Sequence, residues 1–472
     1  MTILSHSTPI LLSVLMTLIG LTKAATAQEI DPQDAFYLKQ LHTDALAEGQ
    51  AYDWLAYMTQ RIGGRLSGTP QAAAAVEYTR QMLDTLGMDS VWLQPCTVPH
   101  WERGEPEQVR IVNSSQIGTQ ALHALALGGS VGTGPDGLTA TVIEVQSLDE
   151  VAQLGPMGAL RGKIVFYNRP MDEAQLNTFA AYSGAVDQRT RGARYAARHG
   201  AVAVLVRSIT NRASHTPHTG VTIYEEGTPQ IPAIAISTND ADLLSRLLRH
   251  EAVRVYMRNT SRNLSPKLSY NVIGEIKGST HPDEILLVGG HLDSWDVASG
   301  AHDDASGCVH AMEVIRLLRA TGYRPKRTIR CVLFMNEENG QFGSKAYADS
   351  SNLKGEFHLA AIESDRGGFV PRGFTTEGVD STYLTRYKAL TRWAPLLEPY
   401  GLELSGGGSG ADISRLKSQG GLLIGLKPDS QRYFDYHHNP DDGLHAVNRR
   451  ELHLGAAAMA SLIYLIDKYG LE

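Results

Sequence analysis

Histidine and carboxylate side chains cluster in five short segments of the second half of the chain. The segments are His291-Leu292-Asp293, Gly300-Ala301-His302-Asp303-Asp304, Asn336-Glu337-Glu338, Glu363-Ser364-Asp365 and Tyr436-His437-His438. If these groups meet at one place, their carboxylates repel one another unless cations neutralise them. A donor set of imidazole nitrogen and carboxylate oxygen without sulfur is typical of a catalytic zinc site. The number of donors suffices for two ions that share a bridging carboxylate.

The adjacent residues Glu337 and Glu338 predict two different roles. Neighbouring side chains on extended backbone point in opposite directions, so we expect one to bind metal and the other to stay free beside it. A zinc ion lowers the pKa of its bound water to about 7. A free carboxylate can accept that proton and pass it to a leaving amine. This combination predicts a hydrolase.

The pattern of the chain from Tyr270 onward explains how the five segments would meet. Short apolar runs alternate with helical stretches, at Glu284–Val288, Gly307–Arg319, Ile329–Met335, Leu359–Ile362, Leu384–Trp393, Leu422–Leu426 and about Arg450–Lys468. The alternation predicts an α/β fold with a mixed, largely parallel sheet flanked by helices. Ligands bind beyond the carboxyl ends of the strands in such sheets. Four of the five segments follow an apolar run, so we expect the site at this edge.

Residues 118–262 have a different texture. Short β runs separated by Gly, Pro, Asn and Asp turns predict a small β-rich domain, and one helical stretch lies at Thr190–Arg198. We expect this domain to be inserted between two parts of a catalytic domain, residues 28–117 and 263–472. No catalytic constellation is evident in it, and we expect His215 and His218 to lie on a polar surface loop.

Composition and the N-terminus limit the location and the partners of the protein. The chain has 472 residues with 43 Lys and Arg against 50 Asp and Glu, a net charge of −7. This balance argues against sequence-independent nucleic-acid binding. The apolar stretch over residues 9–21, followed by Ala25-Thr26-Ala27, predicts a signal peptide over residues 1–27 that is cleaved near Ala27-Gln28. We therefore expect a secreted or periplasmic protein that is free of the membrane after cleavage.

The motifs resemble those of the co-catalytic zinc aminopeptidases, in particular the plasma glutamate carboxypeptidase branch. The resemblance rests on residues 291–295, 300–307, 336–340, 363–365 and 437–442, and extends to residues 61–70. Residues 162–165 and 192–201 resemble parts of an inserted protease-associated domain. The resemblance covers almost the whole mature chain. It implies a zinc exopeptidase fold and a homodimer.

The resemblance also implies a set of metal ligands. His291 and Asp365 would bind one zinc ion, Glu338 and His438 would bind a second, and Asp303 would bridge the two. The cofactor would therefore be two zinc ions per chain.

Four further residues receive a role from the same resemblance or from their position. Glu337 would be the general base, and Asp293 would accept a hydrogen bond from the other ring nitrogen of His291. His437 also lies where it can face the metal, although His438 fits the family pattern better, and His437 would then help to polarise the tetrahedral intermediate. Asp412 either caps the helix that follows it or belongs to a glycine-rich loop whose backbone N–H groups bind substrate.

We expect a di-zinc exopeptidase that hydrolyses dipeptides or short peptides with a free N-terminus. The nucleophile would be a metal-bound hydroxide, with Glu337 as general base. Other zinc-dependent amide chemistry, such as an N-acyl amino-acid amidase or a glutaminyl cyclase-like transfer, is the first alternative. The full set of five ligands argues against a one-zinc cyclase. A receptor-like binding protein on the same fold is the second alternative, although binding alone does not require the ligands and the base.

Overall fold

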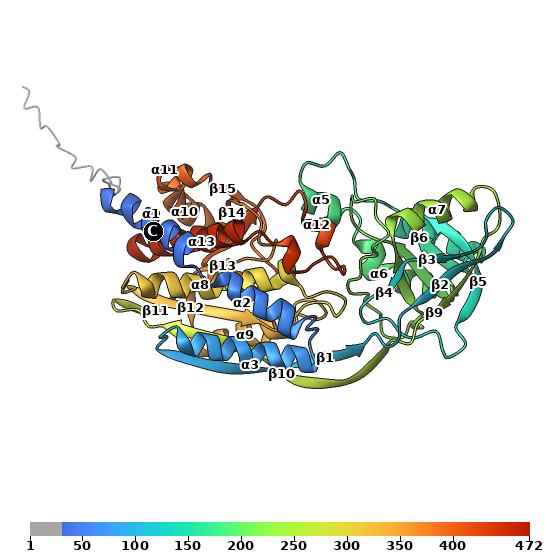
Figure 1. Cartoon of the computed structure of the whole chain (residues 1–472), viewed down its shortest axis with the longest axis horizontal. Helices are drawn as coiled ribbons and strands as arrows, with labels where there is room; N and C mark the ends of the chain where they lie inside the picture. The colour runs from blue at the N-terminus through green and yellow to red at the C-terminus, as the bar shows by residue number, and fades with distance from the viewer. Residues whose placement is uncertain (1–30) are drawn as a thin grey trace, which may run out of the picture.

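The computed structural model describes residues 31–472, which form two bodies that lie side by side (Figure 1). Each body contains an eight-stranded sheet. The larger sheet consists, in spatial order, of β1 (Ser90–Glu102), β10 (Arg262–Ile276), β12 (Arg327–Phe334), β11 (His281–His291), β13 (Phe357–Glu363), β16 (Leu422–Pro428), β14 (Pro371–Glu377) and β15 (Glu403–Gly406). The predicted signal peptide lies outside the described residues.

The centre of the larger sheet is parallel. Strand β11 pairs in parallel with both β12 and β13, and β13 pairs in parallel with β16. Strands β10 and β14 pair antiparallel with β12 and β16. The predicted α/β fold with a mixed, largely parallel sheet is confirmed. The four central strands carry the apolar runs that the sequence shows, because strands covered on both faces bury every side chain.

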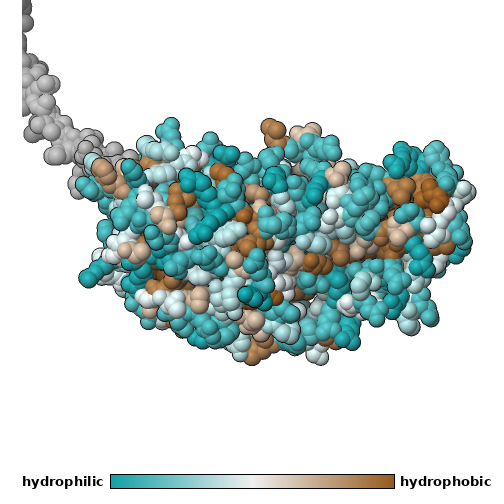
Figure 2. Space-filling view, viewed as in Figure 1, coloured by the Kyte–Doolittle hydropathy of each residue, from teal (hydrophilic) through white to brown (hydrophobic). Residues whose placement is uncertain are grey.

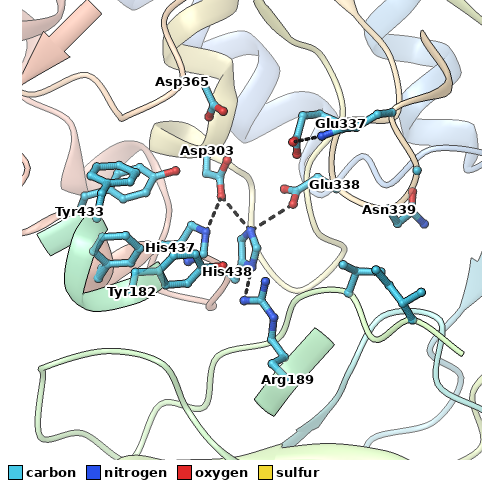
Figure 3. Close-up of a pocket in the computed structure, with 16 residues that line it drawn as sticks. Tyr182, Arg189, Asp303, Glu337, Glu338, Asn339, Asp365, Tyr433, His437 and His438 are labelled. Carbon is cyan, nitrogen blue, oxygen red and sulfur yellow. Dashed lines mark hydrogen bonds and ion pairs between the residues drawn. The ribbon is translucent and has the colours of Figure 1, made fainter. Parts of the chain in front are cut away.

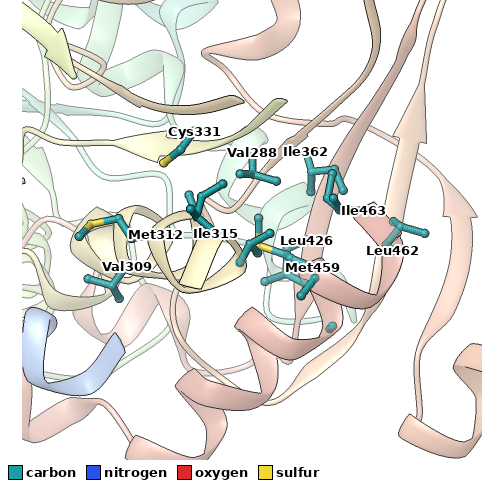
Figure 4. Packing of buried hydrophobic residues seen from close by; sticks show 14 of the residues in the cluster. Val288, Val309, Met312, Ile315, Cys331, Ile362, Leu426, Met459, Leu462 and Ile463 are labelled. Carbon is teal, nitrogen blue, oxygen red and sulfur yellow. The ribbon is translucent and has the colours of Figure 1, made fainter. Parts of the chain in front are cut away.

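Helices cover both faces of this sheet. Leu286 and Val288 of β11 pack in the same core as helices α1 (Pro32–Glu48), α2 (Ala51–Tyr57), α3 (Pro70–Thr85), α8 (Ser306–Ala320) and α13 (Arg449–Tyr469). Leu287 faces the opposite way, toward α9 (Phe342–Lys354) and the short turn Ile413–Gln419. Figure 4 shows α8 and α13 against the strands, where Ile463 of α13 lies beside Ile362 of β13. This packing makes the sheet a rigid support for the residues at its edge.

The second body is built on its own sheet. Its strands, in spatial order, are β3 (Gly118–Leu122), β2 (Gln108–Ser114), β9 (Arg254–Arg258), β5 (Leu138–Val145), β6 (Ile164–Tyr167), β7 (Ala203–Arg207), β8 (Ala233–Ile236) and β4 (Ala124–Ala126). Ile164 and Phe166 pack toward α7 (Thr238–Leu248), whereas Val165 and Tyr167 pack toward α4 (Leu148–Leu154) and α6 (Asp187–Ala197). We call this body, residues 108–258, the insert.

The predicted start of the insert at residue 118 is too late. Strand β2 pairs with β9 and β3 of the insert, and Val109 and Ile111 belong to the insert core. The error arises because β2 has no turn-rich composition of its own, so that only its pairing assigns it. At the other end, β9 ends at Arg258 and β10 of the larger sheet begins at Arg262.

The surface and the remaining helices complete the fold. Hydrophilic residues cover most of the face shown in Figure 2, and apolar ones appear there only in small groups. The described part of the chain contains no helix with the length and apolar character needed to cross a membrane. The shorter helices are α5 (Thr178–Ser183) in the insert and α10 (Asp380–Thr391), α11 (Ala394–Leu397) and α12 (Tyr433–Tyr436) in the larger body.

Candidate metal centre

The five segments with histidine and carboxylate side chains meet at the carboxyl edge of the larger sheet. His291 is the last residue of β11, Glu338 follows β12, and Asp365 follows β13. Asp303 lies in the turn η3 (Ala301–Ala305) that leads into α8, and His438 follows α12. The register of the parallel strands places their carboxyl ends together, so residues far apart in sequence share one site.

Asp303 stands between two groups of potential ligands (Figure 3). Its Oδ1 lies 3.2 Å from Nε2 of His291, and that nitrogen lies 3.5 Å from Oδ1 of Asp365. Its Oδ2 lies 3.2 Å from Nε2 of His438, and that nitrogen lies 3.1 Å from Oε2 of Glu338. The two oxygens of one carboxylate thus face the two groups, which is the arrangement that a bridging ligand requires.

The residues present fit a pair of divalent cations. Among the described residues, Oε1 of Glu338 is buried without a hydrogen-bond partner. A buried carboxylate oxygen without a partner is costly unless a cation satisfies it. The donors are imidazole nitrogens and carboxylate oxygens, the set that zinc accepts in catalytic sites.

The electrostatics of the protein alone point in the same direction. Burial, with a contribution from neighbouring carboxylates, raises the pKa of Glu337 to about 8 and that of Glu338 to about 7. Burial lowers the pKa of His438, but the carboxylates of Glu338 and Asp303 outweigh it and raise this pKa to about 9. Metal binding requires ionised carboxylates and neutral imidazoles. Cations would therefore displace the protons that this cluster otherwise holds.

Glu337 and Glu338 point in different directions, but not for the predicted reason. They lie in a turn after β12 rather than on extended backbone, and Asn336 before them has φ +73°. Glu338 faces His438, whereas Oε1 of Glu337 accepts a hydrogen bond of 3.3 Å from Gln341. Glu337 lines the cavity beside the cluster, where a free carboxylate can act on a bound substrate.

Asp293 supports this turn rather than the ring of His291. Its Oδ1 accepts the backbone N–H of Asn336 at 2.7 Å and of Glu337 at 3.0 Å. The ring Nδ1 of His291 lies 3.0 Å from the backbone oxygen of Asp293 and 3.8 Å from the carboxylate. The expected carboxylate–imidazole hydrogen bond is therefore wrong, because the backbone carbonyl occupies that position and fixes the tautomer instead.

The two adjacent histidines differ in their distance from the ligand groups. Nε2 of His437 lies 3.8 Å from Oδ2 of Asp303, which is farther than the 3.2 Å of His438. The two rings stack with their centres 3.5 Å apart. Burial holds the pKa of His437 well below its usual range. His438 is thus the better-placed ligand, and His437 presents a neutral ring to the cavity.

Asp412 does not take either of its expected roles. It makes no capping hydrogen bond to the turn that follows it, and it is not among the residues that line the cavity. The backbone N–H groups of Asp412 and Ile413 instead donate to the carboxylate of Glu363, at 3.4 and 2.9 Å.

The insert forms the second wall of the site, and the sequence pattern does not predict which of its residues face the cavity. A cavity of about 640 Å³ lies between the two bodies. The catalytic wall includes Asp303, Glu337, Glu338, Asp365, His437 and His438, and the insert contributes Phe179, Tyr182, Arg189, Val221 and Ile223. These insert residues follow no motif and lie on a short helix, on α6 and on a loop, so no spacing signal marks them.

His218 of the insert holds the loop that carries His438. Its Nδ1 lies 2.7 Å from the backbone oxygen of His437, and Nδ2 of Asn439 lies 3.0 Å from its Nε2. The backbone N–H of Thr219 donates to the backbone oxygen of His438 at 2.9 Å. The expected surface loop is wrong for His218, which is buried by these contacts, whereas His215 is exposed.

An α/β sheet with two linked groups of histidine and carboxylate ligands beside a free glutamate defines a metal-dependent hydrolase. Comparison with known proteins specifies the class. Residues 271–463 match the model of peptidase family M28. Carboxypeptidase Q of Bos taurus is 35% identical over 449 residues, which cover 93% of this chain and 91% of the relative. The chain therefore belongs to peptidase family M28 and is a metallopeptidase.

Solved structures agree with this assignment. The crystal structure of a peptidase M28 precursor from Shewanella amazonensis has a TM-score of 0.86 at 34% identity, covering 93% of this chain and 98% of its own. A zinc aminopeptidase from Bacillus subtilis has a TM-score of 0.63 at 20% identity, covering 88% of this chain and 94% of its own, and it shares the fold. The predicted membership in the zinc aminopeptidase family with carboxypeptidase Q relatives is confirmed.

Proposed function

We propose that the protein is a di-zinc exopeptidase that hydrolyses dipeptides or short peptides with a free N-terminus. The observation that carries the proposal is Asp303, whose two carboxylate oxygens each face one group of potential ligands. One ion would be held by His291 and Asp365 and the other by Glu338 and His438, with Asp303 shared. When bound, such ions polarise a peptide carbonyl and make water a better nucleophile.

The residues around the ligands would transfer the proton, hold the turn and bind the reacting carbonyl. Glu337 lines the cavity and holds a carboxylate that accepts a proton and returns it to the leaving amine. The hydrogen bonds that the carboxylate of Asp293 accepts from backbone N–H groups keep the turn of Glu337 and Glu338 in place. His437, neutral because of burial, would donate a hydrogen bond to the oxygen of the reacting carbonyl without adding charge.

The cavity suits a short peptide. Its volume of about 640 Å³ is in the range that binds small organic ligands. Carboxylate oxygens on the catalytic wall that metal ions leave free can accept hydrogen bonds from the ammonium group of a free N-terminus. Aromatic residues Phe179, Tyr182 and Tyr433 offer apolar contacts for side chains.

We also propose export, on the basis of the sequence, and dimerisation, on the basis of the family resemblance. The apolar stretch and the small residues before Gln28 support cleavage of a signal peptide and a secreted or periplasmic enzyme. The expected partners are short peptides and a second copy of the chain, not nucleic acid.

The test compares a dipeptide with its N-acetylated form. Purified mature protein is loaded with zinc, its metal content is measured by plasma mass spectrometry, and hydrolysis of Leu-Leu and N-acetyl-Leu-Leu is followed by mass spectrometry. We expect two zinc ions per chain and cleavage of Leu-Leu alone. Cleavage of the acetylated form at a similar rate would make the enzyme an N-acyl amidase or a carboxypeptidase. Zinc binding without any cleavage would favour a binding protein.

A further inference from the structure

An arginine of the insert lies next to the candidate metal centre. Helix α6 directs Arg189 into the cavity, where its guanidinium approaches the ring of His438 from the side opposite Asp303 (Figure 3). The residue is only 6% exposed. A buried charge at this position needs either a partner in the protein or a ligand.

The protein supplies no adequate partner for this charge. Nη1 of Arg189 lies 3.4 Å from the backbone oxygen of Thr219 and 3.4 Å from Nδ1 of His438. Within residues 31–472, its Nε has no hydrogen-bond partner, and no carboxylate lies within ion-pair distance of it. The nearest aromatic face is that of Tyr182, 5.5 Å from the guanidinium carbon. Arg103, a partly buried arginine near the junction of the two bodies, by contrast pairs with Glu107 and Asp296.

The contact with His438 cannot serve as a hydrogen bond once a metal is bound. An imidazole that binds a metal through Nε2 carries its proton on Nδ1 and offers only a donor there. A guanidinium also offers only donors. In the loaded enzyme, Arg189 and Nδ1 of His438 would therefore both be hydrogen-bond donors and could not bond to each other. The guanidinium would then be free to donate to a different acceptor.

The surrounding backbone leaves room for the guanidinium. A Cβ atom on Gly220 would lie 2.4 Å from the guanidinium carbon of Arg189, so any side chain at position 220 would displace it. Gly220 has φ +129°, which side chains rarely adopt. The loop of the insert is thus shaped to hold an arginine at the wall of the cavity.

We propose that Arg189 binds the C-terminal carboxylate of the substrate and so selects short peptides with a free C-terminus. The inference rests on the proposed function, because it places the scissile bond at the ligand cluster. In a dipeptide the terminal carboxylate lies one residue beyond that bond, and consecutive Cα atoms are about 3.8 Å apart. One imidazole ring, that of His438, separates Arg189 from the cluster, and Arg189 faces the same cavity from the wall of the insert. A guanidinium is the side chain best suited to pair with a carboxylate.

The experiment varies both the C-terminus of the substrate and the residue at position 189. Zinc-loaded wild type, R189Q and R189K are compared on Leu-Leu and on Leu-Leu-amide, which has no terminal carboxylate. The control is R191Q on the same helix, because Arg191 is exposed and lies 3.7 Å from Asp187 instead. Zinc content is measured for every variant.

We expect wild type to prefer the free acid. R189Q should lower kcat/KM for Leu-Leu by about 10–100-fold, mainly through KM, because a hydrogen-bonded charge is lost. The same variant should leave Leu-Leu-amide nearly unchanged, so that the preference disappears. R189K should recover part of it, and R191Q should behave as wild type.

Two results would overturn the inference. Equal cleavage of acid and amide by wild type would show that no carboxylate is bound. An equal loss on both substrates in R189Q would make Arg189 a positioning residue of His438. If wild type cleaves neither substrate, the proposed function fails, and calorimetric binding of the acid and the amide to wild type and R189Q then decides the role of Arg189 separately.

Discussion

The two walls of the cavity differ in how they are built. On the catalytic wall, three of the five ligand candidates lie at the ends of parallel strands whose positions are fixed by a sheet buried on both faces. On the wall of the insert, the residues that line the cavity come from α5, α6 and the loop 218–223. The first wall has the groups for chemistry, and the second has one arginine among apolar and aromatic side chains. The difference places the proposed catalytic groups in one domain and the proposed carboxylate-binding arginine in the other.

The loop that carries His437 and His438 is where the insert contacts the catalytic wall. The insert holds this loop through His218 and Thr219, which bond its backbone. Packing supports the same junction, because rings of Phe179 and Tyr182 stack on those of α12. His438, a candidate metal ligand, thus depends for its position on a domain that contributes none of the candidate ligands.

The largest effect is expected from Glu337, which separates chemistry from metal binding on the catalytic wall. The substitution Glu337→Gln keeps the shape of the side chain but removes the proton acceptor. We expect kcat to fall by about 10²–10⁴-fold while zinc content stays at the wild-type level. Stopped assays with mass spectrometry and plasma mass spectrometry measure the two quantities. Wild-type turnover would exclude Glu337 as the base, and loss of zinc would make it a ligand.

The matched substitution Glu338→Gln should differ from Glu337→Gln in its effect on zinc content. Oε2 of Glu338 lies 3.1 Å from His438, and its other oxygen is buried without a partner within residues 31–472. Removing this charge should lower zinc content as well as turnover. If both variants kept their zinc, the assignment of the second ion would be wrong.

A smaller effect is expected from His218, which tests whether the insert positions the catalytic loop. The substitution His218→Ala leaves the amide of Asn439 and the carbonyl of His437 without their partner, at a cost of about 1–3 kcal/mol. We expect kcat to fall about tenfold, since a misplaced ligand weakens the metal centre. His215→Ala is the control, because His215 lies on the same loop but is exposed. Equal kcat values for His218→Ala and His215→Ala would show that His218 does not position the catalytic loop.

The sequence predicts the catalytic wall far better than the wall of the insert. His291, Glu338 and Asp365 follow apolar runs, and the rule that parallel strands end at one edge is enough to bring them together. Arg189 and His218 gain their positions from the docking of two bodies. Docking leaves no periodic pattern in either segment, so His218 resembles any histidine in a polar loop.

Local backbone geometry also lies beyond the sequence pattern. The turn after β12 depends on the backbone φ angle of Asn336. The ring of His291 is held by the backbone carbonyl of Asp293 rather than by its carboxylate. Neither feature is marked by the type of residue. The start of α3 is the contrasting case. Thr69 accepts a hydrogen bond from Ala72 and Pro70 begins the helix, as residue type alone predicts.

Acid should weaken the junction between the walls in a measurable way. Burial lowers the pKa of His218 from 6.5 to about 3, so the folded chain keeps this ring neutral. Below pH 6.5 the unfolded chain gains a proton that the folded chain does not. The free energy of unfolding therefore falls as the pH decreases toward 3.

The contribution of His218 is isolated by the substitution His218→Asn. In zinc-free protein, urea unfolding at pH 7 and pH 5.5 should show wild type losing about 1 kcal/mol more than the variant. Zinc is left out because its binding depends on pH by itself. Equal losses would mean that His218 is protonated in the folded protein, contrary to its buried position.

The smallest effect is expected from Asp412, a candidate of the sequence that does not line the cavity. Both of its carboxylate oxygens are buried without a hydrogen-bond partner among residues 31–472. Burial, reinforced by the carboxylate of Glu363, raises its pKa well above the ordinary value. Asp412→Asn removes the charge without changing the shape of the side chain. We expect unchanged kcat/KM and an unfolding temperature that stays the same or rises by about 2–4 °C. A tenfold loss of kcat/KM with zinc retained would instead return Asp412 to the substrate site, and the catalytic wall would then extend beyond the residues that line the cavity.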